Sequence, residues 1–264
     1  MTPRPRTPID FAIGALAAGG IAAFALRVRA LDRGGALAAI AVGTATYGAL
    51  GLQGAGVLLT FFGSSIVLSR VGGVRKTILL VDVGKTGPRD AAQVLANGGV
   101  AAACALASLY DERFVPAFAG AFAAAAADTW GTEIGTLARG RPRSLLTLRP
   151  IATGLSGGVT AAGSIAEVAG ALCVALASRG LAARAVGAVT AGGCAGALAD
   201  SLLGASLQTL RRCPVCERST EREPHTCGSE TRIVRGLGWF GNDAVNAAAT
   251  ACGALVAGAL ALRR

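Results

Sequence analysis

Apolar runs of residues, separated by short stretches rich in charged residues, glycine and proline, dominate the pattern along the chain. A helix needs about 20 mostly apolar residues to cross the hydrocarbon core of a bilayer, with a range near 17–25. The pattern predicts eight such helices, and six or seven are also compatible with it. The candidate runs are Ile9–Leu26, Gly35–Leu50, Gly54–Ser69, Ala91–Tyr110, Phe114–Leu137, Gly157–Ala177, Ala182–Leu207 and Ala244–Leu262.

The first three runs leave alternatives open. The second and third are short and only residues 51–53 separate them, so they fit two spans, a helical hairpin that does not cross, or one broken helix. The first run follows Arg4 and Arg6, as in a signal peptide, but has no small-residue cleavage pattern before Arg27. We therefore interpret the first run as a retained anchor.

The composition supports a membrane protein. Hydrophobic residues make up 53% of the chain and charged residues only 15%, whereas soluble domains carry about 25% charge. Aromatic residues contribute only 5%, so the apolar character comes from the small and aliphatic residues that let membrane helices pack closely. This composition excludes a disordered chain and a disulfide-stapled secreted module. It predicts one all-α integral membrane domain, a polytopic helical bundle over residues 1–264.

Basic residues are distributed unevenly between the predicted loops. The chain carries 25 Lys and Arg against 15 Asp and Glu, and 18 of the 25 fall in the loops after the first, third, fifth and seventh runs. The positive-inside rule places these loops in the cytoplasm and both termini on the other side of a cell membrane. Because the positive charge sits in short loops between apolar runs, we expect no nucleic-acid partner. Residues 208–238 form the longest of these predicted cytoplasmic loops.

Acidic residues inside the predicted spans are functional candidates, because an ionisable group in the membrane is costly and needs a partner. Asp128 and Asp200 each precede a hydroxyl residue, in Ala-Asp-Thr and Ala-Asp-Ser. Mg²⁺ is usually held by one or two carboxylates together with substrate phosphates, so we expect Mg²⁺ at these two residues. The candidate acids are Asp128 and Glu133 in the fifth span, Glu167 in the sixth, Asp200 in the seventh and Asp243 at the start of the eighth.

Groups suited to binding phosphate flank these acids. Gln93 and Asn97 follow Arg89 at four-residue intervals, which gives one polar stripe entering the fourth span, and Lys85 lies in the same loop as Arg89. A glycine-rich stretch, residues 153–160, opens the sixth span, and the exposed N–H groups of a helix start favour anions. In the eighth span, Asn242 and Asn246 share one helix face. We expect these groups to meet at one face of the membrane.

Each of these features also has a structural explanation. Buried acids can hold helices together by hydrogen bonds, and this alternative stays open for Asp128, Asp200, Glu133 and Glu167. Glycine-rich stretches are often close helix contacts, which is an equal alternative for residues 154–158. The basic residues of the loops can serve as topology signals alone, the favoured interpretation for Arg139, Arg141 and Arg143.

Three of the seven cysteines and the single histidine cluster in the loop after the seventh run, as Cys213-x-x-Cys216 and, after eight intervening residues, His225-x-Cys227. Three thiolates and one imidazole complete a tetrahedral structural zinc site with no open position for catalysis. A reducing cytoplasm disfavours a disulfide. We predict a structural Zn²⁺ that folds residues 208–238 into a cap over the site. A CxxC redox pair and a metal-free loop are the alternatives.

Four motifs follow one another along the chain: RDAAQVLANGG at Arg89–Gly99, ADTWGTEIG at Ala127–Gly135, ADSLLGASLQ at Ala199–Gln208 and NDAVN at Asn242–Asn246. Together they resemble the transmembrane-protein-19-like family, a domain-of-unknown-function family of polytopic membrane proteins that includes the plant phytyl-phosphate kinases. The resemblance covers residues 35–262. One departure is Gly131, where the family pattern has Ala.

This resemblance, and a more distant one to the CTP-dependent membrane kinases of dolichol and phytol and to the phosphatidate cytidylyltransferases, implies a kinase. The expected reaction is Mg²⁺-dependent phosphoryl transfer from a nucleoside triphosphate, with CTP as the expected donor, to an isoprenoid (phytyl- or polyprenyl-type) monophosphate. The expected catalytic residues are Asp128, Asp200, Arg89 and Lys85. The expected substrate-binding residues are Gln93, Asn97, Glu133, Ser156, Ser201, Asn242, Asp243 and Asn246.

The rival function is a transporter or lipid carrier, because such proteins also use intramembrane carboxylates and broken helices. An inverted repeat would place the two Ala-Asp motifs on antiparallel helices. They fall instead in the predicted fifth and seventh spans, which run in the same direction, and this favours the enzyme. A non-catalytic membrane scaffold is a third alternative.

Overall fold

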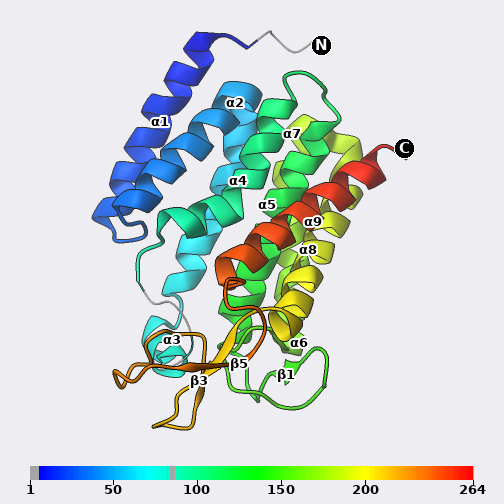
Figure 1. The fold of residues 1–264 in the computed structure, drawn as a ribbon. Coiled ribbons are helices and arrows are strands. Elements are labelled where there is room, and N and C mark those ends of the chain that lie inside the picture. The colour runs from blue at the N-terminus through cyan, green and yellow to red at the C-terminus, as the bar shows by residue number, and fades with distance from the viewer. Residues whose placement is uncertain (1–5, 82, 84–86, 264) are drawn as a thin grey trace.

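The computed structural model describes residues 6–81, 83 and 87–263, and they form a mostly helical bundle (Figure 1). The predicted all-α class is confirmed. The helices are α1 Pro8–Arg27, α2 Arg33–Arg70, α3 Gly73–Leu80, α4 Ala91–Ala107, α5 Phe114–Gly135, α6 Ala161–Ala177, α7 Arg179–Ala182, the 3₁₀ turn η1 Ala183–Ala185, α8 Val186–Ser206 and α9 Asn242–Ala261.

Within the described residues, four helical segments are long and apolar enough to cross a membrane: α1, α2, the segment Arg179–Ser206 and α9. The apolar helices α4 and α6 are shorter, at 17 residues each. Each of the eight predicted apolar runs is largely helical. The number of membrane crossings stays a prediction.

The second and third predicted runs form one helix, α2, that is broken at Gly51. Gly51 has φ 64° and ψ −151°, a backbone conformation that glycine adopts at little cost. The Arg6 side chain donates a hydrogen bond from Nε to the Ala49 carbonyl at 3.1 Å, just before the break. Both ends of α2 meet Arg89, because Asp32 N–H donates to the Arg89 carbonyl and the Arg89 guanidinium contacts Ser65. The chain therefore folds back on itself at Gly51, as Figure 1 shows.

The centre of the bundle is α5, which packs against α4, α6, α8 and α9. Its residues from Ala117 to Ala127 are buried, and most of them are alanine. Phe122 stacks on Phe61 of α2 with ring centroids 5.6 Å apart and makes an edge contact with Phe118. Small side chains let backbones approach closely where no hydrophobic effect between helices operates. The glycine and alanine content of the chain is therefore used for contacts between helices.

Figure 1 places the start of α1 and the end of α9 at one end of the bundle and α3 with the strands at the other, here called the strand-bearing end. The strands are β1 Arg143–Ser144, β2 Gly158–Val159, β3 Leu210–Arg212, β4 Ser219–Thr220 and β5 Arg232–Arg235. The β1–β2 pair is antiparallel, and β3 lies between β4 and β5. The segments that follow the third, fifth and seventh predicted runs thus share one end, and the side of the membrane that this end faces stays a prediction.

The glycine-rich stretch differs from the expectation. Helix α6 begins only at Ala161, where the Thr160 hydroxyl accepts a hydrogen bond from Gly163 N–H at 3.0 Å. Residues 153–159 form a loop and β2 instead of the first turn of the helix. The physical reason is that Gly154 and Gly157 have φ 92° and 78°, values incompatible with a right-handed helix.

A glycine-to-alanine pair on α9 tests the close packing. A methyl group at Gly253 would lie 2.6 Å from Ala124 Cβ and 2.7 Å from the Gly120 carbonyl oxygen, whereas one at Gly258 would make an ordinary contact of 3.5 Å with Ala117. We expect Gly253→Ala to lower the free energy of unfolding by roughly 1–3 kcal/mol. Gly258→Ala should be neutral, or stabilising by up to about 1 kcal/mol.

The measurement is denaturant unfolding of both variants in the same detergent. Equal free energies of unfolding for the two variants would show that α9 does not pack on α5 in this way.

Candidate functional site

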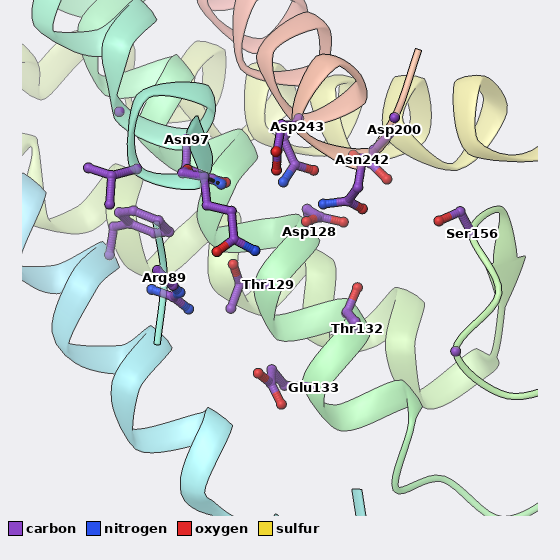
Figure 2. Close-up of a pocket in the computed structure, with 18 of the residues that line it drawn as sticks. Arg89, Asn97, Asp128, Thr129, Thr132, Glu133, Ser156, Asp200, Asn242 and Asp243 are labelled. Atoms are coloured by element: carbon purple, nitrogen blue, oxygen red, sulfur yellow. Dashed lines mark hydrogen bonds between the residues drawn. The ribbon is translucent and has the colours of Figure 1, made fainter. Parts of the chain in front are cut away.

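One cavity of about 1050 Å³ lies between the helices and reaches the strand-bearing end. Its lining brings together predicted residues from α4, α5, α8, α9 and the loops (Figure 2). Lys85 falls outside the described residues, and the roles of the others stay predictions. The predicted residues that line the cavity are Arg89, Gln93, Asn97, Asp128, Glu133, Ser156, Asp200, Ser201, Asn242, Asp243 and Asn246.

Asp128 of α5 and Asp200 of α8 are near neighbours in this cavity. Figure 2 shows them grouped with Asn242 and Asp243 from the start of α9. One oxygen of Asp200, Oδ2, is buried and has no hydrogen-bond partner within the described part of the chain. Two carboxylates this close disfavour double ionisation unless a cation or a proton lies between them. The geometry is therefore that of a cation site or a proton-sharing pair.

Contacts between small residues bring the two acids together. Gly193, Gly196 and Asp200 lie on one face of α8, at spacings of three and four residues. A methyl group at Gly193 would lie 2.9 Å from Ala123 Cβ, and one at Gly196 would overlap Ala124. Asp128 lies one helical turn beyond Ala124 on α5. The glycines thus allow the α5–α8 contact that places the carboxylates side by side.

Glu167 of α6 also lines the cavity, although it is not among the predicted substrate-binding residues. A methyl group at Gly131 would lie 2.6 Å from Glu167 Cγ. The departure from the family pattern at this position therefore gives the Glu167 side chain room against α5.

Arg89 lies immediately before α4 and is held through both its backbone and its side chain. Its N–H donates to the Ala30 carbonyl and its carbonyl accepts from Asp32 N–H, each at 3.0 Å. Its guanidinium donates from Nη2 to Ser65 Oγ at 2.7 Å. Burial lowers the pKa of the Arg89 guanidinium from its ordinary value, and the charge of Glu133 opposes that shift. The result is a fixed guanidinium in the wall of the cavity.

The polar stripe that follows Arg89 is partly structural. Asp90 and Gln93 form a capping box, in which Gln93 N–H donates to Asp90 Oδ1 at 2.9 Å and Asp90 N–H donates to Gln93 Oε1 at 3.1 Å. This reciprocal pair satisfies two donors at the start of α4. Asn97 Nδ2 donates to the Gln93 carbonyl at 2.9 Å. Both predicted substrate-binding amides therefore also stabilise the helix.

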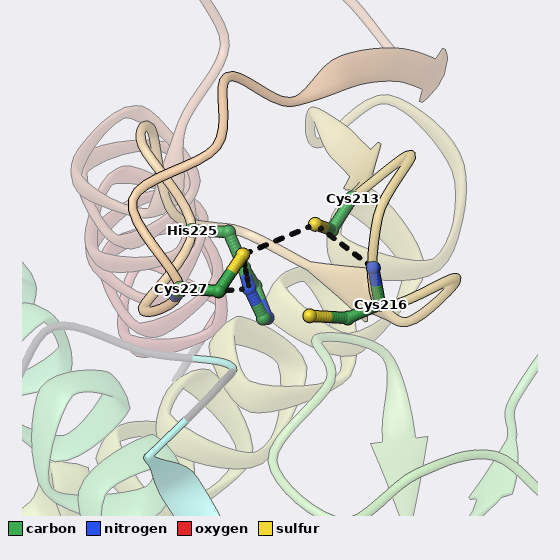
Figure 3. A group of neighbouring side chains, drawn as sticks. All are labelled: Cys213, Cys216, His225 and Cys227. Atoms are coloured by element: carbon green, nitrogen blue, oxygen red, sulfur yellow. Dashed lines mark hydrogen bonds between the residues drawn. The ribbon is translucent and has the colours of Figure 1, made fainter.

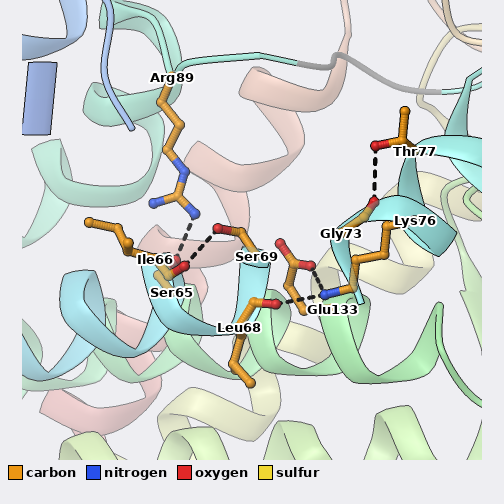
Figure 4. Close-up of polar contacts among 9 residues, drawn as sticks. All are labelled: Ser65, Ile66, Leu68, Ser69, Gly73, Lys76, Thr77, Arg89 and Glu133. Atoms are coloured by element: carbon orange, nitrogen blue, oxygen red, sulfur yellow. Dashed lines mark hydrogen bonds and ion pairs between the residues drawn. The ribbon is translucent and has the colours of Figure 1, made fainter. Parts of the chain in front are cut away.

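Glu133 pairs with Lys76, a contact that sequence spacing did not predict (Figure 4). Lys76 lies on α3, and its Nζ also donates to the Leu68 carbonyl at 2.7 Å. The Lys76 side chain is 7% exposed and that of Glu133 is 21% exposed. Breaking such a buried pair leaves an uncompensated charge. Glu133 thus anchors α3 to α5, and the structural alternative for this acid has direct support.

The glycine-rich loop binds a carboxylate of the chain itself. Ser156 N–H donates to Glu221 Oε1 at 2.8 Å, and Gln208 Nε2 donates to Glu221 Oε2 at 2.9 Å. Burial raises the pKa of Glu221, and its hydrogen bonds from Ser156, the charge of Arg235 and its bond from Gln208 oppose that shift. Sequence analysis missed Glu221, because nothing in its local sequence distinguishes it from surface residues of a charged loop. Gln208 ends the third motif, but its local sequence does not indicate this contact.

The predicted cysteine–histidine cluster is present (Figure 3). The potential ligand atoms of Cys213, Cys216, His225 and Cys227 all lie within 4.8 Å of one another. Cys213 Sγ is 3.6 Å from Cys227 Sγ, and His225 Nδ1 is 3.2 Å from Cys227 Sγ. All three cysteines are free thiols in the structure. The group has the composition and spacing of a metal-binding cluster.

Comparisons with known proteins agree with the motifs. The family described as "Integral membrane protein DUF92" matches residues 16–254. Protein PGR of Arabidopsis thaliana is 29% identical over 253 residues, covering 83% of this chain and 84% of that protein. An uncharacterized membrane protein of Methanocaldococcus jannaschii is 32% identical over 180 residues, covering 67% of this chain and 74% of that protein.

A second uncharacterized membrane protein, from Synechocystis, is 26% identical over 175 residues, covering 63% of this chain and 68% of that protein. No solved structure matches the chain. The family match covers most of the chain and includes all four motifs. The chain therefore belongs to the DUF92 family of integral membrane proteins, the transmembrane-protein-19-like family that its motifs indicate.

Proposed function

We propose that the protein is a membrane-embedded kinase. It transfers the terminal phosphoryl group of a nucleoside triphosphate, CTP by family resemblance, to an isoprenoid monophosphate of phytyl or polyprenyl type. The products are the isoprenoid diphosphate and a nucleoside diphosphate. The observation that carries this proposal is the neighbouring pair Asp128 and Asp200, which faces Arg89 and several amides across one cavity.

The residues present fit a Mg²⁺ ion. Mg²⁺ prefers oxygen ligands and usually binds one or two protein carboxylates plus substrate phosphates. Asp128 and Asp200 supply such oxygens, and the buried Asp200 Oδ2 lacks a hydrogen-bond partner within the described residues. When bound, the ion supplies positive charge to the phosphates of the nucleotide. Asp128 and Asp200 are the residues that would hold it.

The transfer balances without an additional reactant. An oxygen of the acceptor phosphate attacks the terminal phosphorus of the nucleotide, and a new P–O bond forms. The bond from that phosphorus to the bridging oxygen breaks, and the nucleoside diphosphate leaves with the bonding electrons. A phosphate monoester loses its second proton near pH 6, so no side chain has to act as a strong base. Positioning and charge stabilisation remain as the tasks of the protein.

Arg89 supplies fixed positive charge for these phosphates. Its backbone is tied to the Ala30–Asp32 turn and its guanidinium to Ser65, so the charge is oriented before substrate binds. Preorganised groups of this kind need little rearrangement during the reaction. Asn242 and Asn246 lie on the cavity wall beside the acids, where their amides can orient substrate oxygens. Lys85 keeps its proposed role on the basis of sequence alone.

We also infer that Cys213, Cys216, His225 and Cys227 hold a structural Zn²⁺. Their ligand types and mutual distances fit a tetrahedral site. The cluster lies on the chain segment that carries β3 and β4, and Glu221 follows β4 directly. Since Glu221 binds the glycine-rich loop through Ser156 and His225 itself lines the cavity, the metal would stabilise one wall of the cavity.

A lipid carrier is the second candidate function, and the break in α2 at Gly51 is the observation in its favour. Against it, the neighbouring Asp128 and Asp200 both lie near the C-terminal ends of their helices, α5 and α8. These two helices therefore run in the same direction, unlike the halves of an inverted repeat. Transfer of labelled phosphate to the lipid distinguishes the enzyme from a carrier.

Substitution of the two acids tests the kinase. Asp128→Asn and Asp200→Asn keep the side-chain shape but remove the charge that a Mg²⁺–nucleotide complex requires. We expect each to reduce the transfer rate on the order of 10²-fold or more, while thermal stability holds or rises because a buried charge is relieved. The assay supplies CTP, ATP or GTP with a panel of polyprenyl monophosphates and measures diphosphate formation.

Asp111→Asn is the matched control, since Asp111 lies in the turn before α5, is not part of the cavity lining and pairs locally with Arg113. It should keep the wild-type rate. Folded Asp128→Asn and Asp200→Asn proteins that transfer phosphate at the wild-type rate would refute the assignment of these acids as metal ligands.

Metal content tests the cluster. Purified protein should carry about one Zn²⁺ per chain, and Cys216→Ser should lose it while the helices stay folded, because the site needs all four ligands. Cys252→Ser on α9 is the matched control and should keep the metal. Elemental analysis and circular dichroism provide the measurements. Stoichiometric zinc in Cys216→Ser would contradict the ligand assignment.

A further inference from the structure

The cavity extends well beyond the polar residues. From the carboxylates it continues between α1 and the two halves of α2, where its lining is apolar. We call this part the apolar arm and define it by Ala18 of α1 and by Ala39, Gly43, Tyr47, Ala55 and Leu58 of α2. The kinase reaction as described above uses none of these residues.

Small residues keep the apolar arm open while α1 and α2 stay in contact. A methyl group at Gly43 would lie 2.8 Å from Ala18 Cβ, and one at Gly14 would lie 3.1 Å from Tyr47 Cβ. These pairs align α1 antiparallel to the first half of α2. The arm runs from Ala39, near the end of α2 that meets Arg89, to Tyr47. This is eight residues, or about 12 Å along a helix.

The apolar arm also reaches the outside of the bundle. Ile21 of α1 and Leu59 of α2 belong to the cavity lining and are 40% and 43% exposed. In a membrane, such side chains face lipid and not water, so the opening admits a hydrocarbon chain from the side. An apolar space of this kind is a poor site for water, which needs polar partners.

We propose that the apolar arm binds the hydrocarbon tail of a single-chain phosphate amphiphile, whose head group lies at Asp128, Asp200 and Arg89. This inference rests on the proposed function for the position of the head group. It adds the position of the tail and the residue that limits the length of the tail. The total volume of about 1050 Å³ is at the upper end of the range for one small-molecule ligand. Tyr47 is the last α2 lining residue before the Gly51 break, so it marks the far end of the arm.

A pair of substitutions two residues apart on α2 tests the proposal. Ala39 is half-buried in the wall of the arm, whereas Ala41 is exposed and is not part of the lining. Ala39→Phe should fill the arm, and Ala41→Phe adds the same ring to the opposite face of the helix. Binding of radiolabelled geranylgeranyl monophosphate and isopentenyl monophosphate is measured for protein in lipid nanodiscs.

We expect the wild type to bind the longer phosphate more tightly. The tail of isopentenyl monophosphate is too short to occupy the apolar arm. Ala39→Phe should therefore weaken geranylgeranyl monophosphate binding on the order of tenfold and leave isopentenyl monophosphate binding unchanged. Ala41→Phe should behave as wild type. If Ala39→Phe does not fold, Ala55→Phe on the second half of α2 fills the same arm and should give the same result.

Two outcomes overturn the proposal: a wild type with no preference for the longer tail, or a filled arm that leaves that preference intact. Failure of the proposed kinase reaction is distinguishable from failure of the tail site, because binding is measured without nucleotide. A wild-type protein that binds the longer phosphate in an Ala39-dependent manner, yet forms no diphosphate when CTP, ATP or GTP is added, supports the tail site and refutes the proposed reaction.

Discussion

The close contact between α5 and α8 is the constraint on which the rest of the site depends. Two carboxylates come together in an apolar bundle only if the helices that carry them approach along small residues, here Gly193 and Gly196 against Ala123 and Ala124. Charges in such surroundings interact far more strongly than in water. The same contact therefore makes ionisation of both carboxylates costly when no cation is bound, and it strengthens their attraction for a cation that binds between them. The surrounding helices enclose this pair on several sides.

The sequence predicted the helices well because their signal is local. Apolar runs marked each described helix of 17 residues or more, whereas α3 lies outside them. The interruption at residues 51–53 left one broken helix among three alternatives, and α2 breaks at Gly51. The four motifs also identified residues that converge on one cavity from α4, α5, α8 and α9. Ser156, from the glycine-rich stretch, lines the same cavity. Polar residues in apolar helices are rare enough to be found by composition alone.

The missed features are pairings between residues far apart in the sequence. Lys76 and Glu133 are 57 residues apart, and Ser156 and Glu221 are 65 apart. No local spacing distinguishes Lys76, Glu133 or Glu221 from charged residues that face solvent. The glycine-rich stretch was placed at a helix start because composition does not reveal the positive φ angles of Gly154 and Gly157. Its Ser156 N–H, considered a phosphate donor, binds Glu221 instead.

In the predicted eight-span arrangement, the short helices α4 and α6 affect the surrounding lipid. Each has 17 residues, or about 26 Å, which is less than the hydrocarbon thickness of about 30 Å. Such a hydrophobic mismatch is relieved by local thinning of the bilayer or by flanking polar side chains that reach toward the interface. Thinning beside α4 and α6 brings lipid head groups closer to the depth of the carboxylates. For the proposed reaction, such thinning shortens the distance that the phosphate of a lipid substrate must travel into the membrane.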